Sequence, residues 1–335
     1  MNFNYVNINR QKQNGVALIV ILLIVAIVAA LATQMHWQHR ISLKRIDNLS
    51  TLSQARQYAI GGENWAREIL LEDLKESTND NLKELWAEPL PPLPIEGGAI
   101  QGQMYDLQSR FNLNNLISKD GKINRDSVAQ FKRLLRSLEI DENYAVSIAD
   151  WIDSDNYPEF PGGAEDSSYS SLPVPYLTAN QYITDISELM NIKDMNKSVY
   201  QQLKPFVAAL PVETSININT ASAEVLVSIN QQISTSDIDS IISSRESSPF
   251  ESVDEFYRML NLDKPDNSDA LDIQSEYFLT EVEVLLHDKI YRRHIYLFRD
   301  SQSGSVSAYQ YTHSPTALNI EQNNNDQNNS KIESG

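Results

Sequence analysis

The chain has 335 residues, and the roughly 300 after Arg40 suffice for one large domain or two smaller ones. It contains no cysteine, which excludes disulfide bonds and a cysteine nucleophile. Its formal net charge of −18 argues against a nucleic-acid partner, because binding to phosphates requires a basic face.

Residues 1–15 form a short leader that carries Arg10 and Lys12, lacks acidic residues and ends at Gly15. An apolar run begins at the next residue, Val16. This arrangement resembles the amino terminus of type IV prepilins, in which a dedicated peptidase cuts after the glycine. The cut protein then keeps its apolar helix as membrane anchor and assembly stalk.

The apolar run at residues 16–35 predicts a transmembrane helix, and no formal charge follows it before Arg40. A helix rises about 1.5 Å per residue, so about 20 residues cross a hydrocarbon core of about 30 Å. The positive-inside rule places the basic leader in the cytoplasm and the rest of the chain outside it. An ordinary signal peptide cleaved near residues 29–32 is the alternative, although its apolar core would be shorter.

The N-terminal helix is expected to extend over residues 16–76, because small and aromatic residues recur after the span at three- and four-residue steps. Gly61 and Gly62 mark a weak point at which this helix is expected to bend. The proline-rich segment 89–94 predicts an extended connector.

The rest of the chain is predicted to contain strands on both sides of several helices. Strand alternation occurs at 98–107, 276–286, 292–298 and 305–311, helical periodicity occurs at 126–150, 185–210 and 221–260, and a Pro/Gly/Ser-rich loop occupies 155–175. Strands do not stay unpaired, so the early and late strands are expected to share one antiparallel sheet. The sequence therefore predicts an α+β fold with the sheet in 77–117 and 271–314, a large all-α domain inserted at 118–270, and a disordered tail at 315–335.

Several separate motifs resemble those of one family, the minor pseudopilin K of the type II secretion system (general secretion pathway protein K). They are the glycine-ended leader and, in order, the segments 106–116 (DLQSRFNLNNL), 150–155 (DWIDSD), 162–166 (GGAED) and 216–221 (ININTA). The resemblance extends from the leader to about Leu260, and the strands that follow fit it in general shape.

The resemblance implies a pseudopilin fold, in which a long N-terminal helix packs on an antiparallel sheet and a helix-hairpin-helix or SAM-like domain is inserted. It implies a single-pass inner-membrane protein, largely periplasmic, at the tip of the type II secretion pseudopilus. There it would initiate assembly and support protein export across the outer membrane. The implied partners are the minor pseudopilins I, J and H and prepilin peptidase, with no nucleic acid. The implied activity is binding and not catalysis.

The resemblance also implies cleavage after Gly15 and N-methylation of Val16, although other pseudopilins commonly begin with phenylalanine or methionine. The fifth mature residue is Val20, where most pseudopilins have glutamate. A carboxylate in the bilayer costs a few kcal/mol unless a neighbouring subunit's amine pairs with it. A subunit without this carboxylate can still offer its amine, which suits the filament end. The alternative is an ordinary lipid-facing valine.

The segment from Ser137 through Ile192 contains eleven carboxylates and no lysine or arginine. A hard cation with oxygen ligands, above all Ca²⁺, would relieve their repulsion, and Gly162-Gly163 would let carbonyls turn inward. A solvated acidic loop is the alternative, but the resemblance favours calcium because similar proteins carry it in this loop. The predicted ligands are Asp153, Asp155, Glu165 and Asp166, then Asp150, with Asp185 and Glu188 as candidates for a second ion.

No G-x-S-x-G, P-loop or H-E-x-x-H motif occurs, so no catalytic site is predicted. The rival interpretation is a membrane-anchored DNA-binding or DNA-uptake protein, because residues 216–256 are similar to helix-hairpin-helix modules. Such modules place a G-x-G hairpin against phosphate, but residues 229–234 contain no glycine. A third interpretation is an anchored protein with no assembly role.

Overall fold

The computed structural model describes residues 14–265 and 270–314. Most of the predicted leader (1–13) and the predicted disordered tail (315–335) lie outside the described residues. The chain divides into two compact units, residues 1–57 and 58–335, and each is described by itself.

The first unit consists, in its described part, of the beginning of helix α1, which extends over Asn14–Glu76. Every residue from Val16 through Ser50 is exposed, including the apolar ones. This helix is long and apolar enough to cross a membrane. It is therefore compatible with the predicted single-pass anchor, because a water-soluble helix would bury such residues.

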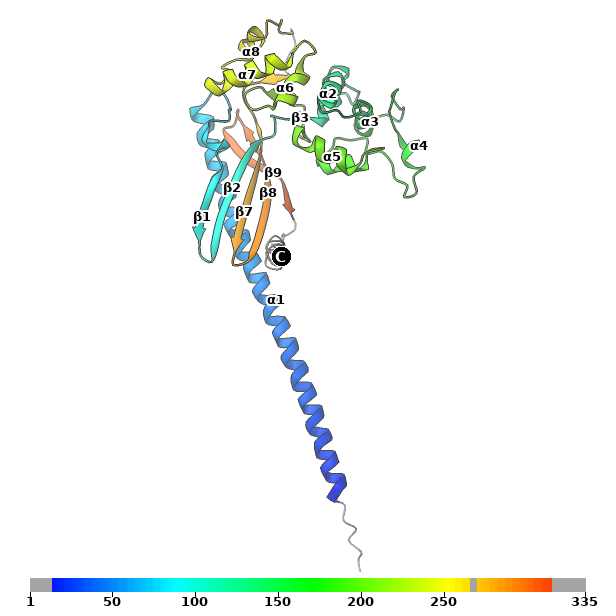
Figure 1. The fold of residues 1–335 in the computed structure, drawn as a ribbon, viewed down its shortest axis with the longest axis vertical. Coiled ribbons are helices and arrows are strands. Elements are labelled where there is room, and N and C mark those ends of the chain that lie inside the picture. Colours follow the sequence, from blue (N-terminus) through cyan, green and yellow to red (C-terminus); the bar gives the residue numbers. More distant parts are fainter. Residues whose placement is uncertain (1–13, 266–269, 315–335) are drawn as a thin grey trace, which may run out of the picture. The chain divides into compact units, whose positions relative to one another are not determined.

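The second unit contains a five-stranded antiparallel sheet in the order β1-β2-β7-β8-β9 (Figure 1). The strands are β1 (Leu90–Ile95), β2 (Gly98–Asp106), β7 (Tyr277–Leu286), β8 (Lys289–Asp300) and β9 (Ser305–Ser314). Strands β2 and β7 pair along their whole length, from Gly98↔Leu286 to Asp106↔Phe278. The predicted antiparallel sheet, shared by early and late segments, is confirmed.

The end of α1 packs on one face of this sheet, and Gly62 lies where the helix approaches β2 and β7 closely. A Cβ atom on Gly62 would lie 3.0 Å from Val282 Cγ1 and 3.4 Å from Ile100 Cδ1. Residues on either side, Ala59 and Ala66, are fully buried. Helix α1 continues through both glycines without a break, and the missing side chain at Gly62 lets the helix approach β7.

Alanine substitutions at the two adjacent glycines are expected to have different effects on stability. A Cβ on Gly61 meets no atom within 4 Å, so Gly61→Ala should stabilise the helix by about 0.5–1 kcal/mol. Gly62→Ala gains the same helix propensity but overpacks against Val282, which costs about 1–3 kcal/mol. The urea midpoint of unfolding should therefore be higher for Gly61→Ala than for Gly62→Ala. Equal midpoints would contradict the close approach of Gly62 to Val282.

The proline-rich segment forms an edge strand and not merely a connector. Strand β1 pairs with β2 through Leu93↔Ile100 and Ile95↔Gly98, with an irregularity between Leu90 and Leu93. Proline has no N–H to donate, so it is tolerated where a strand lies at the edge of a sheet. The same prolines leave few donors on the outer side, which discourages pairing with another chain.

The segment between β2 and β7 contains α2 (Arg125–Ser137), α3 (Asn143–Ile152), α4 (Asp166–Tyr169), α5 (Lys197–Leu203), α6 (Ala223–Ile229), α7 (Thr235–Ser247) and α8 (Val253–Met259). Short 3-10 helices are η1 (Leu85–Ala87), which precedes β2, and η2 (Leu113–Leu116), η3 (Ile186–Asn191) and η4 (Lys204–Phe206), which follow it. The expectation of an entirely helical insert is not met. Two parallel strand pairs also lie there, β3 (Phe111–Asn112) with β4 (Val207–Ala208) and β5 (Ile216–Asn217) with β6 (Leu271–Asp272).

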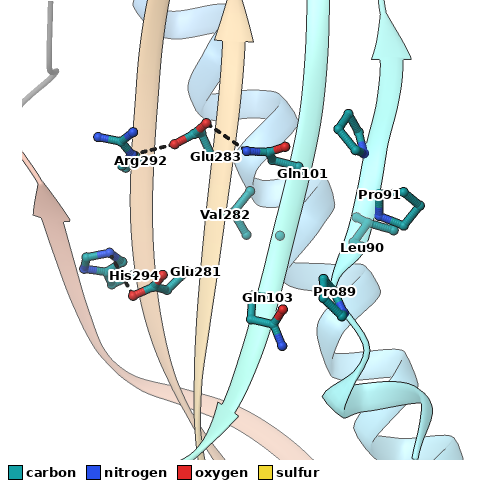
Figure 2. A pocket seen from close by; sticks show the side chains of 12 residues that line it. Pro89, Leu90, Pro91, Gln101, Gln103, Glu281, Val282, Glu283, Arg292 and His294 are labelled. Carbon is teal, nitrogen blue, oxygen red and sulfur yellow. Dashed lines mark hydrogen bonds and ion pairs between the residues drawn. The ribbon is translucent and has the colours of Figure 1, made fainter. Parts of the chain in front are cut away.

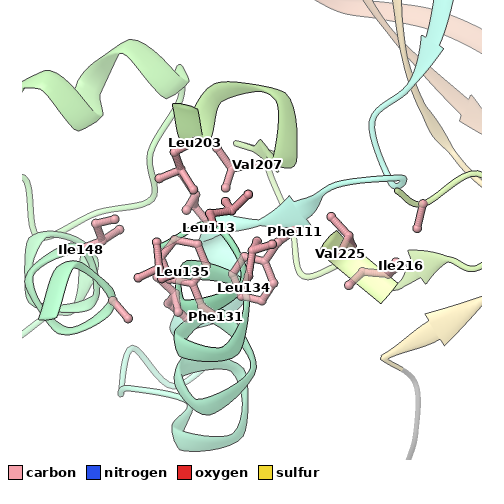
Figure 3. Packing of buried hydrophobic residues seen from close by; sticks show 14 of the residues in the cluster. Phe111, Leu113, Phe131, Leu134, Leu135, Ile148, Leu203, Val207, Ile216 and Val225 are labelled. Atoms are coloured by element: carbon pink, nitrogen blue, oxygen red, sulfur yellow. The ribbon is translucent and has the colours of Figure 1, made fainter. Parts of the chain in front are cut away.

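One hydrophobic core holds this segment together (Figure 3). Its fully buried members include Phe131, Leu134 and Leu135 on α2, which pack with Ile148 of α3. The helix predicted over 126–150 is split into α2 and α3, because Glu139 adopts a φ of +56°, which is incompatible with a continuing right-handed helix.

Buried hydrogen bonds join the inserted segment to the sheet at the end of β2. Asp106 Oδ2 accepts hydrogen bonds from the hydroxyls of Ser275 (2.7 Å) and Thr220, and its Oδ1 accepts one from Gln108 N (2.7 Å). Asn217 Nδ2 donates to Ser275 Oγ at 2.9 Å. Two of the segments quoted above, 106–116 and 216–221, therefore meet at this junction, although they are distant in sequence.

Candidate metal centre

Three of the predicted metal ligands, Asp150, Asp153 and Glu165, form a buried carboxylate cluster. Asp150 lies in the last turn of α3, Asp153 caps the carboxyl end of that helix, and Glu165 caps the amino end of α4. Each side chain offers one oxygen, and these oxygens all lie within 4.8 Å of one another. The three residues are 0%, 2% and 2% exposed, so water screens their repulsion poorly.

Most oxygens of this carboxylate cluster have no hydrogen-bond donor. Asp150 Oδ2 accepts a bond from Glu159 N at 3.1 Å. Within the described residues, Asp150 Oδ1, Asp153 Oδ1 and both carboxylate oxygens of Glu165 are buried without a partner. Each unsatisfied buried polar atom costs about 1–3 kcal/mol. A bound cation would satisfy these oxygens and cancel their charge.

Burial raises the pKa of all three carboxyl groups, and the charges of their neighbours raise it further. The pKa of Asp150 is raised to about 7, that of Asp153 to about 6 and that of Glu165 to about 7. Metal binding requires the deprotonated form, so protons and a cation compete for the cluster near neutral pH.

The glycine pair after Phe160 shapes the cluster. A Cβ on Gly163 would overlap Asp150 Oδ2 and the Glu159 carbonyl oxygen, so only glycine fits there. Gly162 has a φ of +98°, and its carbonyl accepts a hydrogen bond from Ser147 Oγ at 2.7 Å. The expected role of the pair is met in part: it permits a close turn, but the Gly162 carbonyl is engaged by Ser147.

The other predicted ligands lie outside this cluster. Asp155 is exposed and accepts from Tyr157 N at 2.8 Å. Asp166 Oδ1 accepts from Thr178 N at 3.0 Å and from Thr178 Oγ1 at 2.7 Å. These bonds fix the loop around the cluster.

Asp185 and Glu188, the candidates for a second ion, form a capping box at η3. Asp185 Oδ1 accepts from Ser187 N at 2.8 Å, and Glu188 Oε1 accepts from Thr184 N at 2.8 Å and Asp185 N at 3.2 Å. Helix capping accounts for these carboxylates without a metal ion.

A second group of carboxylates, Asp73, Asp80 and Glu84, also lies close together, and no sequence pattern predicted it. Here a cation of the chain is present. Arg299 Nη1 donates to Asp73 Oδ2 and Nη2 donates to Asp80 Oδ1, both at 2.6 Å, while Glu84 Oε2 accepts from Trp86 Nε1 at 2.7 Å. This group is an ion-pair network in which Arg299 compensates part of the negative charge, while burial and the charges of Glu84 and Asp80 raise the pKa of Asp73 to about 7.

A concavity of about 360 Å³ lies on the sheet beside the prolines of β1 (Figure 2). Glu283 accepts from Gln101 Nε2 at 2.9 Å and pairs with Arg292, and Glu281 Oε1 lies 3.5 Å from His294 Nε2. This concavity therefore offers a polar surface in which the charge of Glu283 is compensated by Arg292.

The predicted processing residues, Gly15 and Val16, lie in the first turn of α1. Val16 is 65% exposed, and Val20, the predicted fifth mature residue, is 47% exposed.

In the region similar to helix-hairpin-helix modules, Arg245 of α7 donates to the carbonyls of Ile218 (3.1 Å) and Ala221 (2.6 Å). Its guanidinium is thus occupied within the chain.

Comparisons with known proteins agree on one family. Two family models, both described as type II secretion system protein K, match residues 109–212 and 216–274. A Pseudomonas aeruginosa protein of that name is 36% identical over 292 residues, which cover 84% of this chain and 87% of the relative. One from Pectobacterium carotovorum is 31% identical over 323 residues, which cover 90% of this chain and 97% of the relative.

A solved structure has the same fold. It is the crystal structure of the GspK-GspI-GspJ complex from the enterotoxigenic Escherichia coli type 2 secretion system. The matching chain is 25% identical in sequence, and its TM-score is 0.70. The match covers 81% of this chain and 99% of the matching chain. The match supports the mixed architecture of a long helix and an antiparallel sheet.

Proposed function

Because this chain belongs to the type II secretion system protein K family, we propose that it is a minor pseudopilin at the tip of the pseudopilus, where it initiates assembly and supports export across the outer membrane. The main support for the proposal is the structural match to nearly the whole of a chain that was solved in complex with GspI and GspJ. The action proposed is binding and not catalysis.

The proposed anchor is the beginning of α1, with the span at residues 16–35 in the inner membrane and the bulk of the chain in the periplasm. Prepilin peptidase would cut between Gly15 and Val16, and the new amine would be methylated. The amine of Val16 would pair with a carboxylate of a neighbouring subunit. Because Val20 is not acidic, this subunit would have no carboxylate to pair with the amine of another subunit. This arrangement supports a place at the end of the filament.

The proposed partners are the minor pseudopilins I, J and H. The segment at 118–270 is proposed as a separate domain, related to helix-hairpin-helix or SAM-like modules, whose bulk blocks addition of a subunit above it. Its proposed ligand is Ca²⁺, held by Asp150, Asp153 and Glu165, whose buried unpaired oxygens fit a hard cation. Calcium would supply the charge that lets these carboxylates stay ionised together.

N-terminal sequencing of the mature protein, from cells with and without prepilin peptidase, tests the proposal. The expected result is a start at Val16 that depends on the peptidase, because the glycine-ended leader directly precedes the apolar helix. A Gly15→Asp variant should remain uncut and serves as the negative control. A start near Thr33, or a wild-type leader left intact, would contradict the pseudopilin assignment.

A further inference from the structure

A cleft of about 320 Å³ lies where the inserted segment meets the sheet. Tyr105, Leu279 and Tyr296 line it from the sheet, and Val207 and Leu210 line it from the inserted segment. This volume lies within the range of about 300–1,000 Å³ typical of ligand sites. Its walls combine apolar and aromatic side chains with charged ones, and Arg110, Asp185 and Glu281 also line it.

Arg110 is partly buried and unpaired. Its guanidinium has no hydrogen bond or ion pair within residues 14–265 and 270–314. Burial lowers the pKa of Arg110 below its ordinary value, although a guanidinium remains charged at any physiological pH. A guanidinium presents five donors in a planar fork, and those of Arg110 are free to engage a ligand in the cleft.

The nearby carboxylates attract Arg110 electrostatically but are not bonded to it. Both oxygens of Asp106 accept hydrogen bonds at the junction described above. Asp185 Oδ1 caps η3 through Ser187 N, and Glu281 Oε1 lies beside His294. None of these acids forms an ion pair with Arg110 in the described part of the chain. The guanidinium therefore lies near the charges of Asp106 and Glu281, but no anion among the described residues is bonded to its donors.

A second cation lies at the same cleft. Lys204 lines it, is exposed, and has no ion pair among the described residues. Two cations without an ion pair among these residues therefore lie at one cleft, which Asp185 and Glu281 also line. The fork of Arg110 matches the two oxygens of a carboxylate, and the tyrosine and leucine walls match an adjoining apolar group.

We infer that this cleft binds a carboxylate carried by a polypeptide, with Arg110 as the bidentate contact, Lys204 as the second cation, and Tyr105 and Tyr296 as walls. The carboxylate belongs to an acidic side chain or to a chain terminus, since both present the same two oxygens. The inference concerns a site separate from the carboxylate cluster and does not depend on calcium.

Binding of three dansylated peptides to the full-length chain in detergent, followed by fluorescence anisotropy, tests the inference. The peptides are dansyl-Gly-Gly-Leu-Glu-amide, dansyl-Gly-Gly-Leu-Gln-amide, and dansyl-Gly-Gly-Leu-Gln with a free carboxyl terminus. The first or the third should bind at least about tenfold more tightly than the neutral amide. Which of the two does so identifies the source of the carboxylate.

Substitutions locate the binding site. Arg110→Ala should abolish the preference for a carboxylate, and Arg110→Lys should retain only part of it, because lysine keeps the charge but loses the fork. Arg125→Ala, which removes an exposed arginine on α2, is the matched control and should change nothing. An equal effect of Arg125→Ala, or no carboxylate-dependent binding at about 1 mM peptide, would overturn the inference.

A stability measurement separates ligand binding from a structural role. Arg110→Leu removes an unpaired, partly buried charge, so the melting temperature of the peptide-free chain should stay constant or rise. A marked decrease would show that Arg110 supports the fold and would overturn its assignment as a ligand contact.

Discussion

Chelation of divalent cations is expected to lower the melting temperature of the full-length chain by about 5–10 °C. A ligand present at about 100 times its Kd stabilises by about 2.7 kcal/mol, and 1 kcal/mol corresponds to about 2–4 °C in a chain of this size. The physical reason is the buried cluster of Asp150, Asp153 and Glu165, whose oxygens lack other partners. Thermal unfolding with calcium and with EDTA measures the effect.

Two substitutions make this test specific to the cluster. Glu165→Gln should abolish most of the calcium-dependent shift, because it removes one of the three carboxylates. Asp155→Asn should leave the shift intact, because Asp155 is exposed and lies outside the cluster. An unchanged wild-type melting temperature after chelation would refute a structural calcium ion.

The metal-free chain should also lose stability as the pH rises. The ordinary pKa values of 3.8 for Asp150 and 4.5 for Glu165 are both raised to about 7 in the folded state. The folded state therefore holds protons that the unfolded state has released, and this stabilising contribution disappears between about pH 4 and pH 7. Added calcium should restore more stability at pH 8 than at pH 5, as measured by urea midpoints.

Replacing Arg299 by methionine is expected to destabilise the chain by about 3–5 kcal/mol. Arg299 is 3% exposed and donates to Asp73, Asp80 and the Ser275 carbonyl, each at 2.6 Å. Its removal leaves Asp80, which is 1% exposed, as a buried charge without its cation. The expected result is a lower urea midpoint with an unchanged slope.

Arg292→Met on the same strand is the matched control for this ion-pair network. Arg292 pairs with Glu283, but the two side chains are 40% and 26% exposed, so this pair should contribute less than about 1 kcal/mol. Equal losses of unfolding free energy in the two variants would show that the buried network around Arg299 contributes no more than an exposed ion pair.

Alternation along the strands made the sheet predictable, because Glu281 and Glu283 interrupt apolar residues at every second position. Strand β1 was missed because prolines indicate an interruption, and only its place at the sheet edge explains how they are tolerated. The break between α2 and α3 was missed because Glu139 carries no local signal for a left-handed backbone.

The candidate site was predictable in kind but not in detail. Charge and glycine content pointed to the acidic loop, but the sequence ranked Asp155 and Asp166 ahead of Asp150. Burial distinguishes Asp150, Asp153 and Glu165 from the others, and it depends on how α3 and α4 fold together. The carboxylate partners of Arg299 lie more than two hundred positions away, and the lack of a hydrogen bond at Arg110 appears only when its surroundings are known.

The pairing of β2 with β7 has a consequence for the order in which the chain folds. These strands are neighbours in the sheet but are separated in sequence by residues 107–276. Closing so long a loop is entropically costly if it is unstructured, and long-range strand pairing slows folding. The inserted segment also precedes β7, β8 and β9 along the chain. We therefore expect it to fold early, bring the ends of β2 and β7 together, and leave completion of the sheet as the final, rate-limiting event.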